Sequence, residues 1–209
     1  MDPSEAADTI AESVEVHRHH DETFRSRAAL VIAVLASLLA VCGLGGDNSK
    51  DAMIYNNVKA SDSWSFYQAK NQRQTAYKLA ADQLKRELAM PGLSPEARAV
   101  VQKDLDRYDE TVTRYEDEQD KAAPSDPTRG EGKKQLKARA ESYERAREDA
   151  SDRNDDFDYA QMVLQLAIVL GSVSILSTSR PLLWVSGGLG GLGAVLLANG
   201  FWFKLPLPF

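Results

Sequence analysis

The chain has 209 residues, of which 27% are charged, and a formal net charge of −6. This acidic balance argues against a nucleic-acid partner, because binding to phosphates requires a basic face. The single cysteine, Cys42, excludes an internal disulfide. The charged and apolar residues are segregated along the chain, so windows of sequence are more informative than the average composition.

The first apolar block, residues 28–46, contains no charged residue and follows Arg25 and Arg27. A helix needs about 20 mostly apolar residues to cross the hydrocarbon core of a bilayer. The block therefore predicts a first transmembrane helix. A cleaved signal peptide is the alternative interpretation, but the 27 preceding residues include seven acidic ones, which disfavours it.

Two further apolar blocks, residues 159–178 and 182–203, are separated only by Ser179, Arg180 and Pro181. So short a connection predicts an antiparallel pair of transmembrane helices. A buried helical hairpin in a soluble protein is the alternative. It is disfavoured because helix faces exposed to water would carry charges, and these blocks carry none beyond Tyr159.

Basic residues near the ends of the apolar blocks predict the orientation. Arg18, Arg25 and Arg27 precede the first block, and Arg180 must lie on the same side of the membrane. Because basic residues favour the cytoplasmic side, the N-terminal segment 1–27 is expected in the cytoplasm. The sequence thus predicts a membrane protein with residues 47–158 on the outer side of the membrane, in the periplasm if the cell is a Gram-negative bacterium, and with residues 204–209 as a C-terminal tail.

The charged segment 47–158 reads as helix from Lys50 with two interruptions. Prolines and glycines cluster at residues 90–95 and 123–132, and such clusters end helices. Ser94 followed by Pro95 is typical of a helix N-cap with proline in the first turn. Three extramembrane helices of about 40, 28 and 26 residues are expected.

Apolar residues in these three helices recur at spacings of three and four, as in coiled coils. In the second helix the seam consists of Val101, Leu105, Tyr108, Val112 and Tyr115. The fold class predicted is an all-α membrane protein with three transmembrane helices and a helical hairpin or coiled-coil domain between the first two. Because single seams are thin, association with other copies is expected.

Residues 60–71 (ASDSWSFYQAKN) form an aromatic stripe in which Trp64, Tyr67 and Asn71 share one helix face, and Gln68 follows Trp64 at a spacing of four. Such a stripe suits either the lipid headgroup region or a contact between helices of neighbouring chains. The second is favoured, because Trp64 lies about 30 Å of helix beyond the first apolar block.

The same segment, with the three-span layout, carries a resemblance. The chain resembles an uncharacterised bacterial family that is described as a domain of unknown function. Members of that family carry a similar signature after the first span. In this chain the signature residues are Ser61, Asp62, Trp64, Tyr67, Gln68, Ala69 and Lys70. The resemblance covers most of the chain from about Glu15 onward. It implies a bacterial multi-pass membrane protein and brings no activity, substrate or cofactor with it.

Small residues in the third block predict close helix packing. Gly187 and Gly191 form a GxxxG pair, and Gly190 and Ala194 extend the smooth face. The glycines Gly188, Gly190 and Gly193 also match the nucleotide-binding pattern GxGxxG. That pattern works only at a turn from strand to helix, so its place in an uncharged block argues against nucleotide binding.

Polar side chains in the second block, Gln161, Gln165 and Ser172, share one helix face. Polar groups in lipid seek partners, so this face and Asn199 of the third block are expected to point into the bundle or toward another subunit.

No metal site and no enzyme are expected. His17, His19 and His20 stand beside acidic residues, but ligands confined to five consecutive residues rarely close a tetrahedral shell. The alternative is the solvated end of an amphipathic N-terminal helix. No histidine follows His20, so the usual pairs of nucleophile and base are missing from the charged segment.

The leading hypothesis is therefore a homo-oligomeric structural or assembly scaffold without cofactors. The alternatives are an oligomeric channel lined by Gln161, Gln165 and Ser172, and an accessory subunit of a larger membrane complex.

Overall fold

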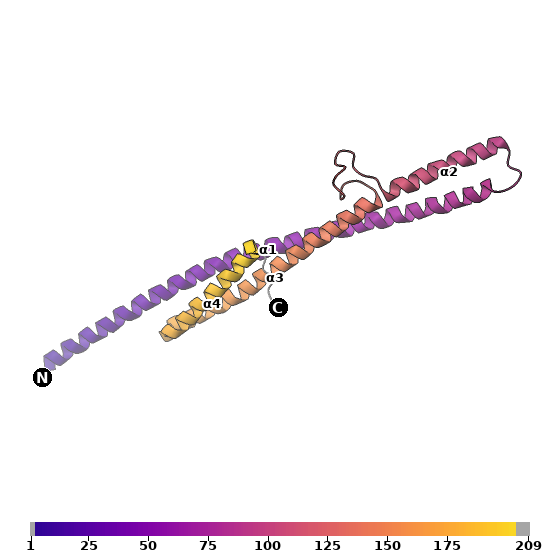
Figure 1. Cartoon of the computed structure of the whole chain (residues 1–209). Coiled ribbons are helices and arrows are strands. Elements are labelled where there is room, and N and C mark those ends of the chain that lie inside the picture. The colour runs from indigo at the N-terminus through magenta and orange to yellow at the C-terminus, as the bar shows by residue number, and fades with distance from the viewer. Residues whose placement is uncertain (1–2, 204–209) are drawn as a thin grey trace. The chain divides into compact units, whose positions relative to one another are not determined.

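The computed structural model describes the backbone of residues 3–203 and the side chains of residues 22–202. Every named element in this range is a helix: α1 (Pro3–Leu88), α2 (Pro95–Glu116), α3 (Lys133–Ser177), α4 (Arg180–Ala198) and the short π-helix η1 (Asn199–Phe203) (Figure 1). The all-α class predicted from the sequence is confirmed. The expected tail 204–209 lies outside the described residues, as do the side chains of the first 21 residues of the N-terminal segment.

The chain divides into two compact units. The apolar unit consists of Met1–Asp51 and Ala150–Phe209, and the charged unit of Ala52–Asp149. Because α1 and α3 contribute to both units, the boundaries fall within helices.

The helix α1 continues without a break from the first apolar block into the charged segment, through Gly43, Gly45 and Gly46. Each glycine within a helix costs about 1 kcal/mol, and the packing of Phe157 against Gly45 and Gly46 offsets this cost. The helix α3 is likewise continuous, since no glycine or proline occurs between Lys133 and Gly171.

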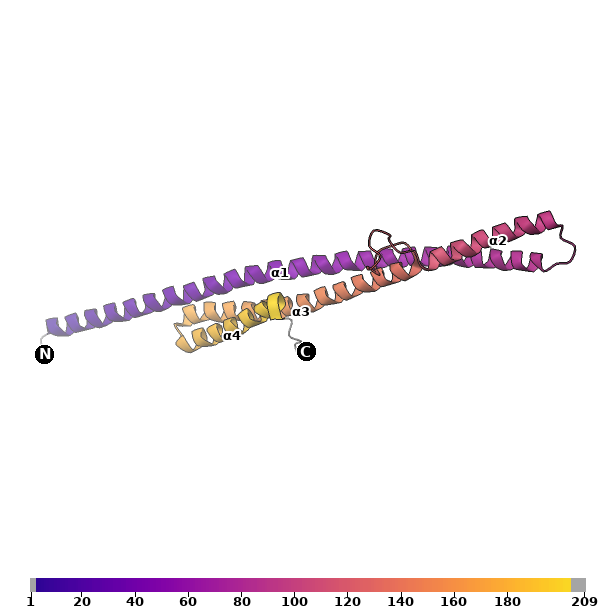
Figure 2. The same ribbon diagram turned by 45° about the horizontal axis from the view of Figure 1, so that its top comes forward.

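In the apolar unit, α3 and α4 lie alongside the part of α1 that contains Leu35 and Cys42 (Figures 1 and 2). Its core contains Leu35 and Cys42 of α1, Phe157 and Leu164 of α3, and Leu197 of α4. By length and composition, the three helices α1, α3 and α4 can each cross a membrane. Their outward faces expose large apolar side chains, including Leu30, Leu44, Val169, Leu176 and Val195. An outward apolar surface of this kind suits hydrocarbon as the solvent.

The turn between α3 and α4 consists of Thr178 and Ser179. Thr178 adopts a φ of 49°, and the Ser179 N–H donates to the Ser174 carbonyl at 3.1 Å. Arg180 and Pro181, expected in the turn, instead begin α4, where proline in the first turn needs no backbone partner.

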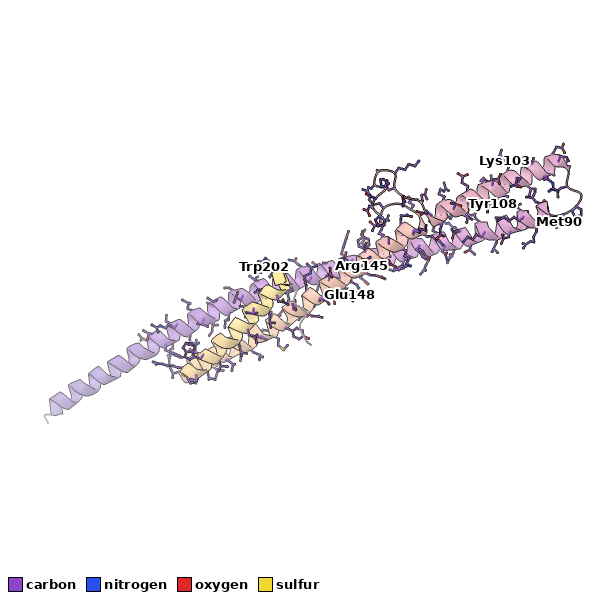
Figure 3. All side chains as sticks on the ribbon, in the orientation of Figure 1. Met90, Lys103, Tyr108, Arg145, Glu148 and Trp202 are labelled. Carbon is purple, nitrogen blue, oxygen red and sulfur yellow. The ribbon has the colours of Figure 1, made fainter. Side chains whose placement is uncertain are left out.

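In the charged unit, α2 runs back beside the C-terminal part of α1 (Figure 1). Tyr77 of α1 packs edge-on against Tyr108 and Tyr115 of α2, with ring centroids 5.4 and 5.8 Å apart; Figure 3 labels Tyr108. The predicted N-cap is confirmed, because the Ser94 hydroxyl accepts the Ala97 N–H at 3.1 Å.

The helix α2 ends at Glu116, earlier than expected, and residues 117–132 form a folded loop. Aspartate side chains compete with the helix for backbone donors here. Asp120 accepts the Ala122 N–H and Asp126 accepts the Thr128 N–H, both at 2.9 Å. Such local hydrogen bonds favour turns over further helix.

Candidate functional site

The aromatic stripe of the charged unit contacts α3 of the same chain. The Trp64 indole N–H donates to the Glu144 carboxylate at 2.8 Å, and the Tyr67 ring meets Trp64 edge-on at 5.6 Å. Spacing alone favoured a neighbouring chain as the partner, because it does not show that α3 returns along this face. Gln68 points away from this contact and is exposed.

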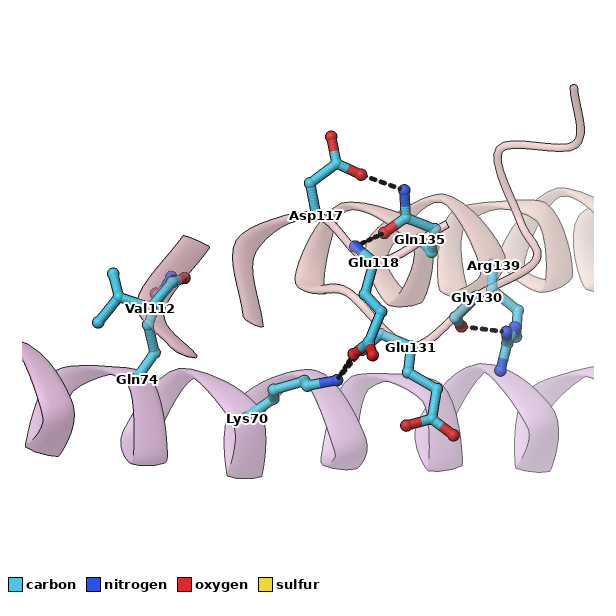
Figure 4. A network of polar contacts seen from close by, with 9 residues as sticks. All are labelled: Lys70, Gln74, Val112, Asp117, Glu118, Gly130, Glu131, Gln135 and Arg139. Atoms are coloured by element: carbon cyan, nitrogen blue, oxygen red, sulfur yellow. Dashed lines mark hydrogen bonds and ion pairs between the residues drawn. The ribbon is translucent and has the colours of Figure 1, made fainter. Parts of the chain in front are cut away.

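Lys70 follows the aromatic stripe on α1 and anchors the loop 117–132 to this helix. Its ammonium group forms an ion pair with Glu118 at 3.2 Å and donates to the Glu131 carbonyl (Figure 4). The Lys70 side chain is 15% exposed and lies 5.1 Å from the centre of the Tyr115 ring. Because this charge is largely removed from water, removing its partner Glu118 is expected to lower stability more than breaking an exposed ion pair would.

The loop is also held from α3. Gln135, which is buried, donates to the Asp117 carboxylate at 2.8 Å and accepts the Glu118 N–H at 3.2 Å (Figure 4). Arg139 donates to the carbonyls of Thr128 and Gly130 at 2.9 and 2.8 Å. The loop, the beginning of α3 that follows it and the distant Lys70 of α1 therefore share one polar network.

Gln74 and Lys133 complete this network, and sequence reasoning missed both. The Gln74 amide, 2% exposed, donates to the Val112 carbonyl at 2.9 Å and to the Glu116 carboxylate at 3.0 Å. Lys133 forms an ion pair with Glu116 at 3.1 Å and donates to Asn71 at 3.0 Å. A signal for Gln74 was present, since it continues the three-and-four spacing of the aromatic stripe.

Glu116 makes the charged unit sensitive to acid. The hydrogen bond from Gln74, followed by that from Lys133, lowers the pKa of Glu116 below its ordinary value. A carboxylate whose pKa is lower in the folded state stabilises the fold above its unfolded pKa. This contribution is lost as the pH falls through the folded pKa. The free energy of unfolding is therefore expected to fall more steeply below about pH 4.5 in the wild type than in Gln74→Leu.

The measurement is denaturation of the full chain in detergent, followed by Trp64 fluorescence with Trp184 and Trp202 replaced by Phe. Gln72→Leu, at an exposed position of the same helix, is the control and should keep the wild-type pH dependence. Equal slopes in wild type and Gln74→Leu would contradict the role given to Gln74.

In the apolar unit, the glycines of α4 that the sequence analysis assigned to one packing face have different surroundings. An added Cβ at Gly190 would collide with Leu35, and one at Gly193 would approach the Leu164 side chain to 2.7 Å. Gly187 and Gly191 have no atom within 4 Å of an added Cβ. Gly190 and Gly193 thus pack within the chain, whereas the GxxxG pair lies on an open face. Ala194 is partly exposed.

The polar residues of α3 also differ in their exposure. Gln165 and Ser172 are exposed, Gln161 is half-buried, and the Ser172 hydroxyl donates to the Ile168 carbonyl of its own helix at 2.9 Å. No described residue hydrogen-bonds the Gln165 amide. The buried face of α3 includes Leu164, Ala167, Gly171 and Ser174.

Asn199, by contrast, is buried and donates to the Asp156 carboxylate at 3.0 Å. Burial raises the pKa of Asp156, and the hydrogen bond from Asn199 opposes this effect. Asn199 therefore points into the bundle, and Gln165 and Ser172 point outward.

Among the residues whose side chains are described, no three histidine, cysteine, aspartate or glutamate side chains gather in a metal-binding arrangement. The side chains of His17, His19 and His20 lie outside the described residues.

Comparison with known proteins gives one match. A family model described as Domain of unknown function (DUF4337) matches residues 6–203. No curated protein and no solved structure matches the chain.

Proposed function

Since the chain belongs to the DUF4337 family, whose description assigns no activity, we propose from the chain's own surfaces that it is a homo-oligomeric membrane scaffold. In this proposal α1, α3 and α4 cross the bacterial inner membrane. The N-terminus is cytoplasmic, and the charged segment 47–158 forms a periplasmic helical hairpin with coiled-coil seams. Arg25, Arg27 and Arg180 support this orientation, because they flank the same ends of the spans.

The observation that carries the proposal is the outward stripe of α3. Gln165 and Ser172 alternate with Val169 and Leu176 at spacings of four, three and four, and all four side chains are exposed. An amide in hydrocarbon without a hydrogen-bond partner costs several kcal/mol. A second copy of the stripe supplies donors and acceptors at the same depth, so self-association satisfies the amide.

The open face of α4 gives independent support. Gly191 leaves the helix backbone uncovered, so the helix of another chain can approach closely enough for dispersion to act. Among the described residues this face has no partner, while the other glycine face is already filled by Leu35 and Leu164.

Gln165→Leu is expected to weaken the oligomer. An interhelical hydrogen bond in a membrane contributes about 0.6 to 2 kcal/mol, which corresponds to roughly a 3- to 30-fold rise in the dissociation constant per contact. The measurement is energy transfer between labelled full-length chains in bilayers at increasing lipid-to-protein ratio, with native mass spectrometry of gently extracted protein.

Met162→Leu, a substitution of similar size at an exposed position of the same helix, is the control and should leave association unchanged. A purified wild-type monomer, or a complex containing only one copy beside another protein, would refute the scaffold proposal. The second result would favour an accessory subunit.

The same stripe supports a second candidate, a channel whose pore is lined by Gln161, Gln165 and Ser172. Ion flux through the same reconstituted samples distinguishes the channel from the scaffold. Ion flux that is present in wild type and changed by Gln165→Leu at constant oligomeric state favours the channel, and silent bilayers at all voltages remove it.

A further inference from the structure

A cavity of about 570 Å³ lies in the apolar unit between the start of the first span and the beginning of α4. Arg27 and Arg180 contribute its charged lining, and Phe24, Leu183 and Trp184 contribute apolar and aromatic surface. The cavity thus combines two cationic groups with an apolar wall. This combination matches a molecule with an anionic head and a hydrocarbon tail.

The two guanidinium groups supply the positive charge of this cavity. Among the side chains that the structure describes, neither Arg27 nor Arg180 forms an ion pair with a carboxylate. The helix α4 begins at Arg180, so the positive end of its dipole lies beside the same two guanidinium groups. Phosphate oxygens satisfy guanidinium groups in a planar, bidentate geometry.

The cavity is deep enough for the headgroup end of a phospholipid and the first part of its acyl chains. Val31 lies one helical turn beyond Arg27, and Gly187 lies two turns beyond Arg180, so the cavity extends roughly 10 Å from the charged end along the helices. An added Cβ at Gly187 meets no atom within 4 Å, so the missing side chain leaves this end of the cavity open. Trp184 is 82% exposed beside the arginines, as aromatic residues at the headgroup level are.

We infer that this cavity binds a phospholipid with an anionic headgroup, whose phosphate lies between Arg27 and Arg180 and whose acyl chain follows Val31 and Gly187. The site goes beyond the scaffold proposal, because it lies within one copy of the chain. Gly187, which the sequence assigned to helix packing, forms the apolar end of this lipid site, whereas Gly191 remains on the open face.

The test is native mass spectrometry of the full-length protein with phosphatidylglycerol or phosphatidylcholine added at matched concentrations. Wild type is expected to retain phosphatidylglycerol in preference to phosphatidylcholine. Arg27→Gln and Arg180→Gln should each lower this retention about fivefold, since one basic residue contributes about that factor at an anionic membrane surface. Gly187→Leu should lower it as well, because it fills the cavity without changing the charge.

Two control variants separate the site from its surroundings. Arg25→Gln removes an exposed arginine outside the cavity, and Gly191→Leu alters the open face; both should retain lipid as wild type does. A loss with Arg25→Gln equal to that with Arg27→Gln would show general surface attraction and overturn the site. So would full retention in Gly187→Leu. Competition by inorganic phosphate at concentrations similar to the lipid would show a free-anion site and also overturn the lipid assignment.

Discussion

Phe157→Ala is expected to destabilise the apolar unit by about 3 to 5 kcal/mol, the usual range for removing a buried aromatic ring. Phe157 is 2% exposed, and its ring lies against Gly45 of α1, Gly200 of η1 and, edge-on at 4.9 Å, Phe201. Its removal leaves a cavity between three helices that the glycines cannot fill. The measurement is unfolding in mixed micelles, followed by Trp202 fluorescence with Trp64 and Trp184 replaced by Phe.

Phe66→Ala is the matched control, since that ring is 66% exposed, and its effect should stay within about 0.5 kcal/mol. A double-mutant cycle tests the contact itself. An added Cβ at Gly45 would lie 2.5 Å from the Phe157 ring, so Gly45→Ala alone should cost about 1 to 3 kcal/mol. In the Phe157→Ala background the same change should cost nothing or stabilise. Additive losses would show that the two residues do not contact each other.

Gly130→Ala is expected to destabilise the charged unit by about 2 to 4 kcal/mol, the sum of backbone strain and a collision. Gly130 has a φ of 123°, and an added Cβ would collide with the Glu118 carbonyl. That carbonyl accepts the Glu131 N–H at 2.9 Å, so moving it disturbs the loop that Lys70 holds. Denaturation followed by Trp64 fluorescence, in the background without the other tryptophans, measures the loss.

Gly92→Ala separates the effect of backbone strain from the effect of the collision with Glu118. Gly92 has a similar φ of 104°, but an added Cβ there meets no atom within 4 Å. Its cost should therefore be that of strain alone, about 1 to 2 kcal/mol. Equal losses at the two positions would show that the contact between residue 130 and Glu118 contributes nothing to stability.

The lipid cavity and the scaffold proposal depend on different glycines of α4, and variants of these two glycines distinguish the proposals. Gly191→Leu is expected to weaken association and to leave lipid binding intact. Gly187→Leu is expected to release lipid. The two proposals therefore fail independently.

The sequence by itself determined the helical class, the three apolar helices, the position of the first loop and the end of the second loop, but not the point at which α2 stops. These are local properties: an uncharged run, a Ser-Pro cap or a cluster of prolines and glycines acts on its own neighbourhood. The Ser94 cap and the interruption that ends before it were correct for this reason. The family resemblance seen in the segment 60–71 is likewise confirmed by the match to residues 6–203.

Only the tertiary structure decided what the glycines and polar side chains contact. Gly45 does not end a helix, because Phe157, distant in sequence, fills the space beside it. Spacing places Gly190 and Gly191 on adjoining faces, but only the positions of Leu35 and Leu164 show which face is covered. Trp64 donates to Glu144 of the same chain, and no described residue hydrogen-bonds Gln165. Periodicity defines the faces of a helix, whereas the element that packs against each face depends on the path of the whole chain.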